Sequence, residues 1–188
     1  MRKGTVMEMI SLYADAVQRN QKRVEKVRTD QLDGPTPCTE WTTEALLDRI
    51  IGGYRIFATA LGTTVPEPVA DLATAHRAAG DAAVRAFSAP DARQRSVVLP
   101  VGEVPGDVAL GLALTDAVVH GWDLAKATGQ DTTVDEPLAT MLLAGVEQSV
   151  TADMRQPGGG MPVFAPPVPV DAGRPAGDRL IAFLGRQP

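Results

Sequence analysis

Apolar residues recur every three or four positions along most of the chain, which is the spacing of one face of an α-helix. The first such stretch, residues 7–28, carries the stripe Met9, Ile10, Tyr13, Ala16, Val17, Val24 and Val27. Residues 42–61, 71–88 and 107–128 show the same spacing, and a further stretch runs from Glu136 to about Met154. The pattern predicts an all-α protein with four main helices.

Turn and capping residues divide these stretches. Thr42 has the hydroxyl of a helix N-cap, and Gly62 and Gly129 follow the last apolar positions of two helices, where glycine commonly ends a helix. The runs 96–100 and 102–105 predict a short β-hairpin before the helix at 107–128. We expect the four helices to pack with antiparallel neighbours in an up-and-down bundle.

The C-terminal region has a different composition. Residues 156–177 contain six prolines and five glycines, which exclude regular structure, together with apolar residues such as Phe164 and Val168. We therefore predict a Pro/Gly-rich strap, residues 156–188, that lies over the bundle and is held at its end by the apolar segment 178–184. No composition change marks a second domain, so residues 1–188 are expected to form one domain.

Composition and charge exclude several partners. The 188 residues carry a formal net charge of −5, which disfavours nucleic acid because phosphate binding needs a basic face. No membrane-spanning segment is expected, and the single cysteine, Cys38, excludes a disulfide within the chain and favours a cytoplasmic location. The protein is expected to be a monomer or a homodimer that acts on a small-molecule substrate.

The helix predicted at 107–128 carries the strongest candidate chemistry. Asp116, His120 and Asp123 stand at offsets of zero, four and seven, which places them within a sector of about 60° on one helix face. An acid and a histidine spaced in this way can bind one metal ion together, or the carboxylate can hold a histidine that acts as a base. A simple salt link without a functional role is the structural alternative.

Four ordered motifs resemble a largely actinobacterial family of metal-binding proteins related to the N-terminal domain of mycothiol-dependent maleylpyruvate isomerase, within the DinB-like superfamily. They are Thr36-Pro-Cys-Thr-Glu-Trp-Thr42, Leu46-Leu-Asp-Arg-Ile-Ile-Gly-Gly53, Val119-His-Gly-Trp-Asp-Leu-Ala-Lys-Ala-Thr-Gly129 and Phe164-Ala-Pro-Pro-Val-Pro-Val170. The resemblance implies a DinB-like four-helix bundle. It also implies a divalent metal, zinc or nickel, held by one histidine on the second helix and by an acid and a histidine on the fourth.

This chain departs from the family's ligand set. His120 matches the family's histidine, and Asp116 stands where a glutamate is usual, but Arg49 replaces the histidine of the second helix. Arginine stays protonated and cannot bind a metal. In one hypothesis the Arg49 guanidinium occupies the place of the metal and pairs with Asp116. In the other, Arg49 points away and a metal remains on Asp116, His120 and a substitute ligand, Asp48 or Glu44.

Two functions from different classes follow. The first is a small-molecule enzyme of the maleylpyruvate isomerase-like lineage, an isomerase or a transferase that uses a low-molecular-weight thiol. There His120 would be a metal ligand or a general base, Asp116 a co-ligand or orienting partner, and Arg49 the anchor of a substrate carboxylate. The alternative is a metal-independent ligand-binding or biosynthetic protein, a cyclase for example, that uses the old metal cavity as a pocket.

Other residues have simpler expected roles. We expect His76 to face solvent and Cys38 to be buried and inert. Trp41 and Trp122 are expected to anchor the core. The candidate pocket is expected to include Trp122, Asp123 and Tyr54, with Phe164 on the strap as its lid.

Overall fold

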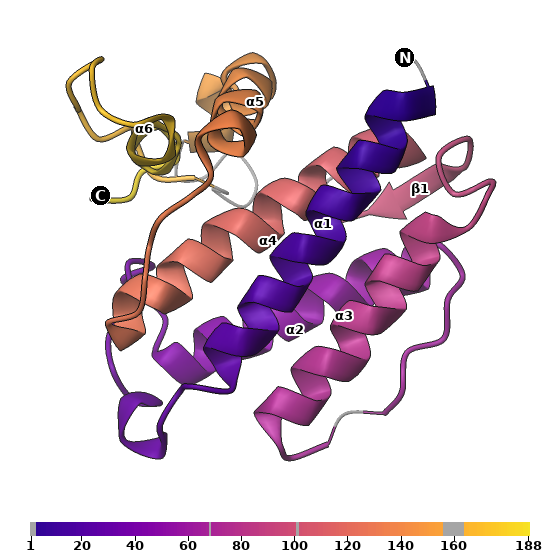
Figure 1. Ribbon diagram of the computed structural model, residues 1–188, viewed down its shortest axis with the longest axis horizontal. Helices are drawn as coiled ribbons and strands as arrows, with labels where there is room; N and C mark the ends of the chain where they lie inside the picture. The colour runs from indigo at the N-terminus through magenta and orange to yellow at the C-terminus, as the bar shows by residue number, and fades with distance from the viewer. Residues whose placement is uncertain (1–2, 68, 101, 156–163) are drawn as a thin grey trace. The chain divides into compact units, whose positions relative to one another are not determined.

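The computed structural model describes residues 3–67, 69–100, 102–155 and 164–188, and it divides into two compact units, residues 1–130 and 131–188 (Figure 1). The first unit contains α1 (Lys3–Val24), η1 (Thr29–Gln31), α2 (Thr43–Ala60), α3 (Leu72–Ser88), β1 (Ser96–Leu99), β2 (Gly102–Pro105) and α4 (Gly106–Thr128). The second contains α5 (Glu136–Ser149), η2 (Ala152–Arg155) and α6 (Ala176–Phe183). The single domain over 1–188 stays a prediction.

The protein is mostly helical with one small antiparallel sheet, which confirms the broad all-α prediction. The expected caps are present: the Thr42 hydroxyl accepts the Ala45 amide at 3.2 Å, and Gly129 ends α4 with a φ of 70°. The hairpin is also confirmed, because β1 and β2 pair antiparallel with Val98 opposite Glu103.

The arrangement of the four main helices differs from the simple up-and-down order. Each of α1 and α2 packs against both α3 and α4. Gln130, after α4, donates to the Arg23 carbonyl near the end of α1, so the C-terminal ends of these two helices lie together and the helices are parallel. Helices α2 and α3 are parallel as well (Figure 1). The expectation of antiparallel neighbours throughout was therefore wrong.

A long connection permits the parallel orientation of α2 and α3. Helix α2 has 18 residues and is about 27 Å long. The 11 residues between Ala60 and Leu72 reach at most about 36 Å when extended, so the chain can return along the whole helix before α3 begins.

Polar side chains are buried between α1 and α3, and one of them corrects a prediction. His76 is fully buried instead of facing solvent. Its Nδ1 lies 2.7 Å from Oε1 of Gln21, whose own amide donates to the Ala73 carbonyl, so Nδ1 is the donor. Burial lowers the pKa of the ring, and Nε2 has no hydrogen-bond partner among the described residues, so the ring is neutral. The ring also meets Tyr54 edge-on, with centroids 5.2 Å apart. Small residues make up most of the buried face of α3: Ala75, Ala79, Gly80, Ala82, Ala83 and Ala86.

Helix α4 is long and apolar enough to cross a membrane by length and composition, but 72% of its most apolar window is buried inside the protein. Leu110, Leu114 and Leu124 on this helix are almost completely buried. This burial is that of a core helix.

In the second unit, the described part of the strap packs on α6. The Val168 amide donates to the Ala182 carbonyl at 2.9 Å, and Arg155 donates to the Ala165 carbonyl at 2.7 Å while its guanidinium lies over the Phe183 ring. The apolar C-terminal segment thus holds the strap, as expected. Residues 156–163, the first part of the predicted strap, lie outside the described residues.

We predict that acid destabilises the protein through His76. Burial lowers the pKa of His76 to about 4, below the value of about 6.5 expected in the unfolded chain. Between pH 6.5 and 4 the unfolded state therefore binds a proton that the folded state does not, and the free energy of unfolding falls by about 3 kcal/mol as the pH is lowered.

Urea unfolding followed at pH 7, 5.5 and 4.5 measures this loss. The slope of the free energy of unfolding between pH 7 and 4.5 should be smaller in His76→Gln than in the unsubstituted protein. An equal slope in His76→Gln and the unsubstituted protein would contradict the assignment.

Candidate functional site

A compact loop before α2 places two side chains against α4. The Thr36 hydroxyl accepts the Cys38 amide and bonds to the carbonyls of Cys38 and Trp41, and the Thr43 amide donates to the Gly34 carbonyl at 2.9 Å. These contacts fold residues 34–43 back on themselves. The loop therefore holds Cys38 and Trp41 in defined positions beside the helix that carries His120.

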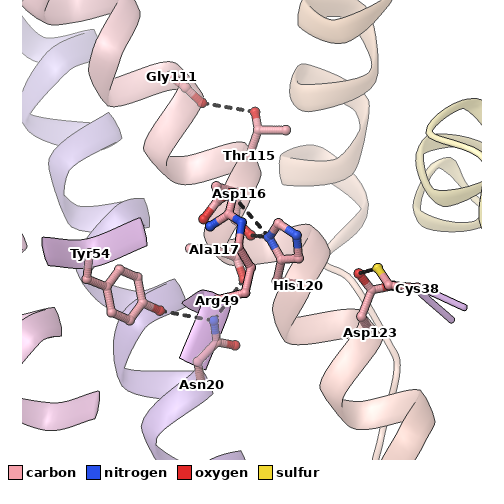
Figure 2. Close-up of polar contacts among 10 residues, drawn as sticks. All are labelled: Asn20, Cys38, Arg49, Tyr54, Gly111, Thr115, Asp116, Ala117, His120 and Asp123. Carbon is pink, nitrogen blue, oxygen red and sulfur yellow. Dashed lines mark hydrogen bonds and ion pairs between the residues drawn. The ribbon is translucent and has the colours of Figure 1, made fainter. Parts of the chain in front are cut away.

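Three predicted site residues meet between α2 and α4 (Figure 2). Arg49 Nη2 lies 2.7 Å from Asp116 Oδ1, and His120 Nδ1 lies 3.2 Å from the same oxygen. His120 Nδ1 is also 3.0 Å from the backbone carbonyl of Asp116. One carboxylate oxygen therefore joins the guanidinium of one helix to the imidazole of the other.

Burial and charge set the ionisation of Asp116. Burial alone would raise the pKa of this carboxyl. His120 and Arg49 have a larger effect in the opposite direction, so the pKa falls to about 2. Asp116 is therefore ionised at neutral pH. Its side chain is 17% exposed and that of Arg49 is 38% exposed, so solvent and solutes reach the cationic end of the pair.

The contacts of His120 determine which nitrogen is basic. Both groups near Nδ1, the carbonyl and the carboxylate of Asp116, accept hydrogen bonds, which assigns the proton of the neutral ring to Nδ1. Nε2 is then the bare nitrogen, and no hydrogen bond to it occurs within the described residues. A histidine held in this way by a carboxylate is suited to act as a base.

The residues around His120 do not fit the divalent metal that the resemblance implies. Among the described residues, no three His, Cys, Asp or Glu side chains gather in an arrangement that would hold a metal ion. The Arg49 guanidinium bonds to the carboxylate oxygen beside His120, and Asp48 and Glu44 are exposed on α2. Arg49 points toward Asp116, so the arrangement in which it points away was wrong.

A neighbouring polar contact comes from α1 and was missed by the sequence analysis. Asn20 Nδ2 donates to the Ala117 carbonyl at 2.8 Å and to the Tyr54 hydroxyl at 3.2 Å (Figure 2). Gly121 makes this approach possible, because a Cβ there would lie 2.1 Å from Asn20 Oδ1. The available signal was a polar residue, Asn20, in register with the apolar stripe of α1. Tyr54, a predicted pocket residue, thus lies beside the site.

Cys38 and Asp123 form a second contact one turn along α4. Cys38 Sγ lies 3.4 Å from Oδ2 of Asp123, whose side chain is fully buried. Cys38 itself is only partly buried, so the expectation of a buried cysteine was wrong; the thiol sits in a surface loop that covers Asp123. Trp41 is also partly exposed, and its ring lies 6.0 Å from that of His120, so it borders the site instead of anchoring the core.

The two remaining predicted pocket residues lie elsewhere. Trp122 is 3% exposed and follows His120 by two residues, so it projects from a different face of α4, where Lys126 Nζ is 5.5 Å from its ring. It is a core residue, as one of its two expected roles required. Phe164 belongs to the second unit, where its amide donates to the Met154 carbonyl at 3.2 Å. Its function as a lid stays a prediction.

Gly53 gives the ion pair its space. A Cβ at this position would lie 2.8 Å from Arg49 Nη1 and 3.0 Å from Asp116 Oδ2. The adjacent Gly52, on the same helix, has nothing within 4 Å of its Cβ position. The second of the two glycines therefore lies directly under the guanidinium and the carboxylate, and the first does not.

The site defines a helical protein with a partly buried Arg-Asp-His cluster between two helices. Two proteins of Mycobacterium tuberculosis, uncharacterized protein MT0763 from strain CDC 1551 and uncharacterized protein Rv0738 from strain H37Rv, are each 43% identical to this chain over 162 residues. The match covers 85% of this chain and 87% of each relative, so the chain belongs to the same family as these actinobacterial proteins. No protein-family model and no solved structure matches the chain.

We predict that the two glycines respond oppositely to alanine. Gly52→Ala should stabilise the protein by about 0.5–1 kcal/mol, because alanine favours the helix and meets no neighbour. Gly53→Ala should lower the free energy of unfolding instead. Its methyl group displaces Arg49 or Asp116, which outweighs the better helix propensity of alanine. Urea unfolding of both variants measures the difference.

The effect of Gly53→Ala should disappear when it is combined with Arg49→Ala and Asp116→Ala, which remove the atoms that the methyl group meets. A loss of stability that persists in this background would show that the glycine acts through another contact.

Proposed function

We propose that this protein is a metal-independent small-molecule enzyme in which His120 acts as a general base, Asp116 orients it, and Arg49 binds the carboxylate of the substrate. The reaction class is an isomerisation or the addition of a low-molecular-weight thiol. The observation that carries the proposal is the single oxygen of Asp116 shared by Arg49 Nη2 and His120 Nδ1, at 2.7 and 3.2 Å.

The charges of the cluster support these roles. Asp116 is ionised and oriented toward Nδ1 of His120, so a proton taken up at Nε2 gives an imidazolium whose charge the carboxylate balances. Arg49 has five N–H donors, and one hydrogen bond, to Asp116, is found for them within the described residues. A partly exposed guanidinium with remaining donors is well suited to bind a carboxylate.

The proposed chemistry needs one base and no further cofactor. In an isomerisation, His120 Nε2 accepts a proton from a carbon of the bound acid, and the imidazolium returns it to another carbon of the same molecule. In a thiol addition, Nε2 accepts the thiol proton, the thiolate forms a bond to an unsaturated carbon, and the imidazolium protonates the neighbouring carbon. Arg49 holds the acid in both cases, which keeps the reacting atoms near Nε2.

The kinship to the maleylpyruvate isomerase-like, DinB-like proteins is part of this proposal. It is supported by the helical bundle of the first unit and by the positions of Arg49, Asp116 and His120 on facing helices. In this proposal the guanidinium provides the positive charge that a metal provides in the family pattern. The cytoplasmic location is likewise proposed.

The alternative is a protein that binds an acid, or promotes its cyclisation or rearrangement by confinement, without proton transfer to His120. The observation that favours it is the same ion pair, which neutralises Asp116 and leaves the Arg49 side chain accessible. The two functions differ in the effect of His120, which is essential for turnover in the first and dispensable in the second.

We predict that the protein accelerates exchange of the methyl protons of pyruvate for deuterium in D₂O. Pyruvate has a carboxylate for Arg49 and acidic protons two carbons away, so a bound molecule should exchange faster than a free one. His120→Gln should lower the accelerated rate by about 100-fold while binding persists. Proton NMR measures both the exchange and the binding.

Arg49→Gln should weaken binding by about 10- to 100-fold and lower exchange in parallel, whereas Arg85→Gln, at an exposed position of α3, should change neither. Binding without exchange in the unsubstituted protein would favour the alternative function. Binding that is unchanged in Arg49→Gln would refute the role of Arg49.

We also predict that the protein purified without chelator contains no stoichiometric zinc or nickel, and that Arg49→His creates a zinc site. The substitution removes a fixed cation and adds a third ligand beside Asp116 and His120, which together with water completes a tetrahedral site. Elemental analysis after dialysis against zinc measures this gain, with Arg55→His as the control. Stoichiometric metal in the unsubstituted protein that is lost on His120→Ala would overturn the proposal.

A further inference from the structure

We infer that the groove lined by Arg55, Ile56, Thr59, Ala60 and Val98 binds an aliphatic chain. This groove lies about two helix turns along α2 from Arg49, so the substrate is an amphipathic acid with its carboxylate on Arg49 and its chain along α2. This inference rests on the proposed function, because it uses Arg49 as the anchor of the carboxylate. It adds the class of the substrate, which the Arg-Asp-His cluster alone does not determine.

Exposed apolar side chains are concentrated at one end of α2 and α4. Ile56 on α2 is 43% exposed, Val108 and Leu112 on α4 are 47% and 36% exposed, and Val98 on β1 is 72% exposed. Ile56 and Val98 line a shallow open groove of about 380 Å³ together with Arg55, Thr59 and Ala60. Two strongly exposed large apolar residues, Ile56 and Val98, therefore meet at one groove instead of being scattered singly over the surface.

The direction of the helices connects this groove to Arg49. Helices α2 and α4 are antiparallel. Cys38, before α2, contacts Asp123, whereas Arg49, later in the chain, contacts Asp116, which precedes Asp123 on α4. Ile56 lies seven residues after Arg49, and Leu112 lies four residues before Asp116. These spacings are close to whole helix turns, so Ile56 lies on the same face of α2 as Arg49, and Leu112 lies on the same face of α4 as Asp116. Because the helices are antiparallel, both residues are displaced from the ion pair in the same direction.

The charges near Arg49 and near Val98 determine the orientation of the bound acid. Arg49 provides the accessible cation at one end. At the other end Glu103 stands opposite Val98 in the hairpin, and Arg55 Nη1 donates to the Pro66 carbonyl, so one acidic and one basic side chain leave this end without net positive charge. An aliphatic acid with its carboxylate at Arg49 and its apolar end near Val98 matches this distribution.

The helix rise gives the length of the chain. Arg49 and Ile56 are separated by about 11 Å along α2 at 1.5 Å per residue. A zigzag hydrocarbon with C–C bonds of about 1.5 Å needs roughly nine carbons to cover that distance. The groove therefore fits a medium-chain acid better than acetate.

Binding of unbranched acids tests the inference. We expect the affinity of acetate, hexanoate, octanoate and decanoate, measured by calorimetry below the concentration at which they form micelles, to rise about two- to fourfold per added methylene. Ile56→Ser and Val98→Ser should remove most of this gain for octanoate and decanoate but leave acetate binding unchanged. Met141→Ser, which alters an exposed apolar residue of α5, is the matched control and should change nothing.

Arg49→Gln should weaken all four acids by about 10- to 100-fold, because each loses the same charged hydrogen bonds. Affinity that depends on Arg49 but not on chain length would overturn the inference and leave the proposed function in place. A chain-length effect that survives Ile56→Ser and Val98→Ser would also overturn it. Absence of binding by every acid would reject the proposed function as well.

A second copy of the chain is the other candidate for the groove. If sedimentation shows a dimer that Val98→Ser dissociates while octanoate affinity stays the same, the groove is a self-association surface and the inference is overturned.

Discussion

The ion pair between Arg49 and Asp116 is the interaction on which the site depends. It holds α2 against α4, and together with His120 it keeps Asp116 ionised despite its burial. The ionised carboxylate in turn assigns the His120 proton to Nδ1 and leaves Nε2 basic. Without Arg49 the partly buried carboxylate would lose one charged hydrogen bond, which costs about 1.5–3 kcal/mol in typical proteins.

Two glycines make this polar interior compatible with close helix packing. Gly53 lies under the guanidinium, and Gly121 allows Asn20 of α1 to reach the Ala117 carbonyl of α4. Each is a position where a methyl group would occupy the place of a hydrogen-bonding atom. The polar contacts are therefore built into the spacing of the helices, so the same small residues that set the packing also position the candidate chemistry.

Much of the local structure could be predicted from the sequence. The stripes of apolar residues identified the helices, and Thr42 and Gly129 marked a beginning and an end because capping depends on residues close in the chain. The spacing of Asp116 and His120 identified their shared face for the same reason. The errors concern contacts between distant segments: His76 is buried because Gln21 of α1 supplies a partner, and Cys38 is partly exposed because its loop lies on the surface above Asp123.

The sequence by itself determined which residues form helices, where several of them end, and that one helix carries an acid and a histidine four residues apart. Tertiary structure decided that α2 and α3 run in the same direction, because an 11-residue connection permits either orientation. It also decided that Arg49 turns toward Asp116. A residue at the edge of an apolar face can point to solvent or inward, and only the position of the facing helix provides the carboxylate that makes the inward position favourable.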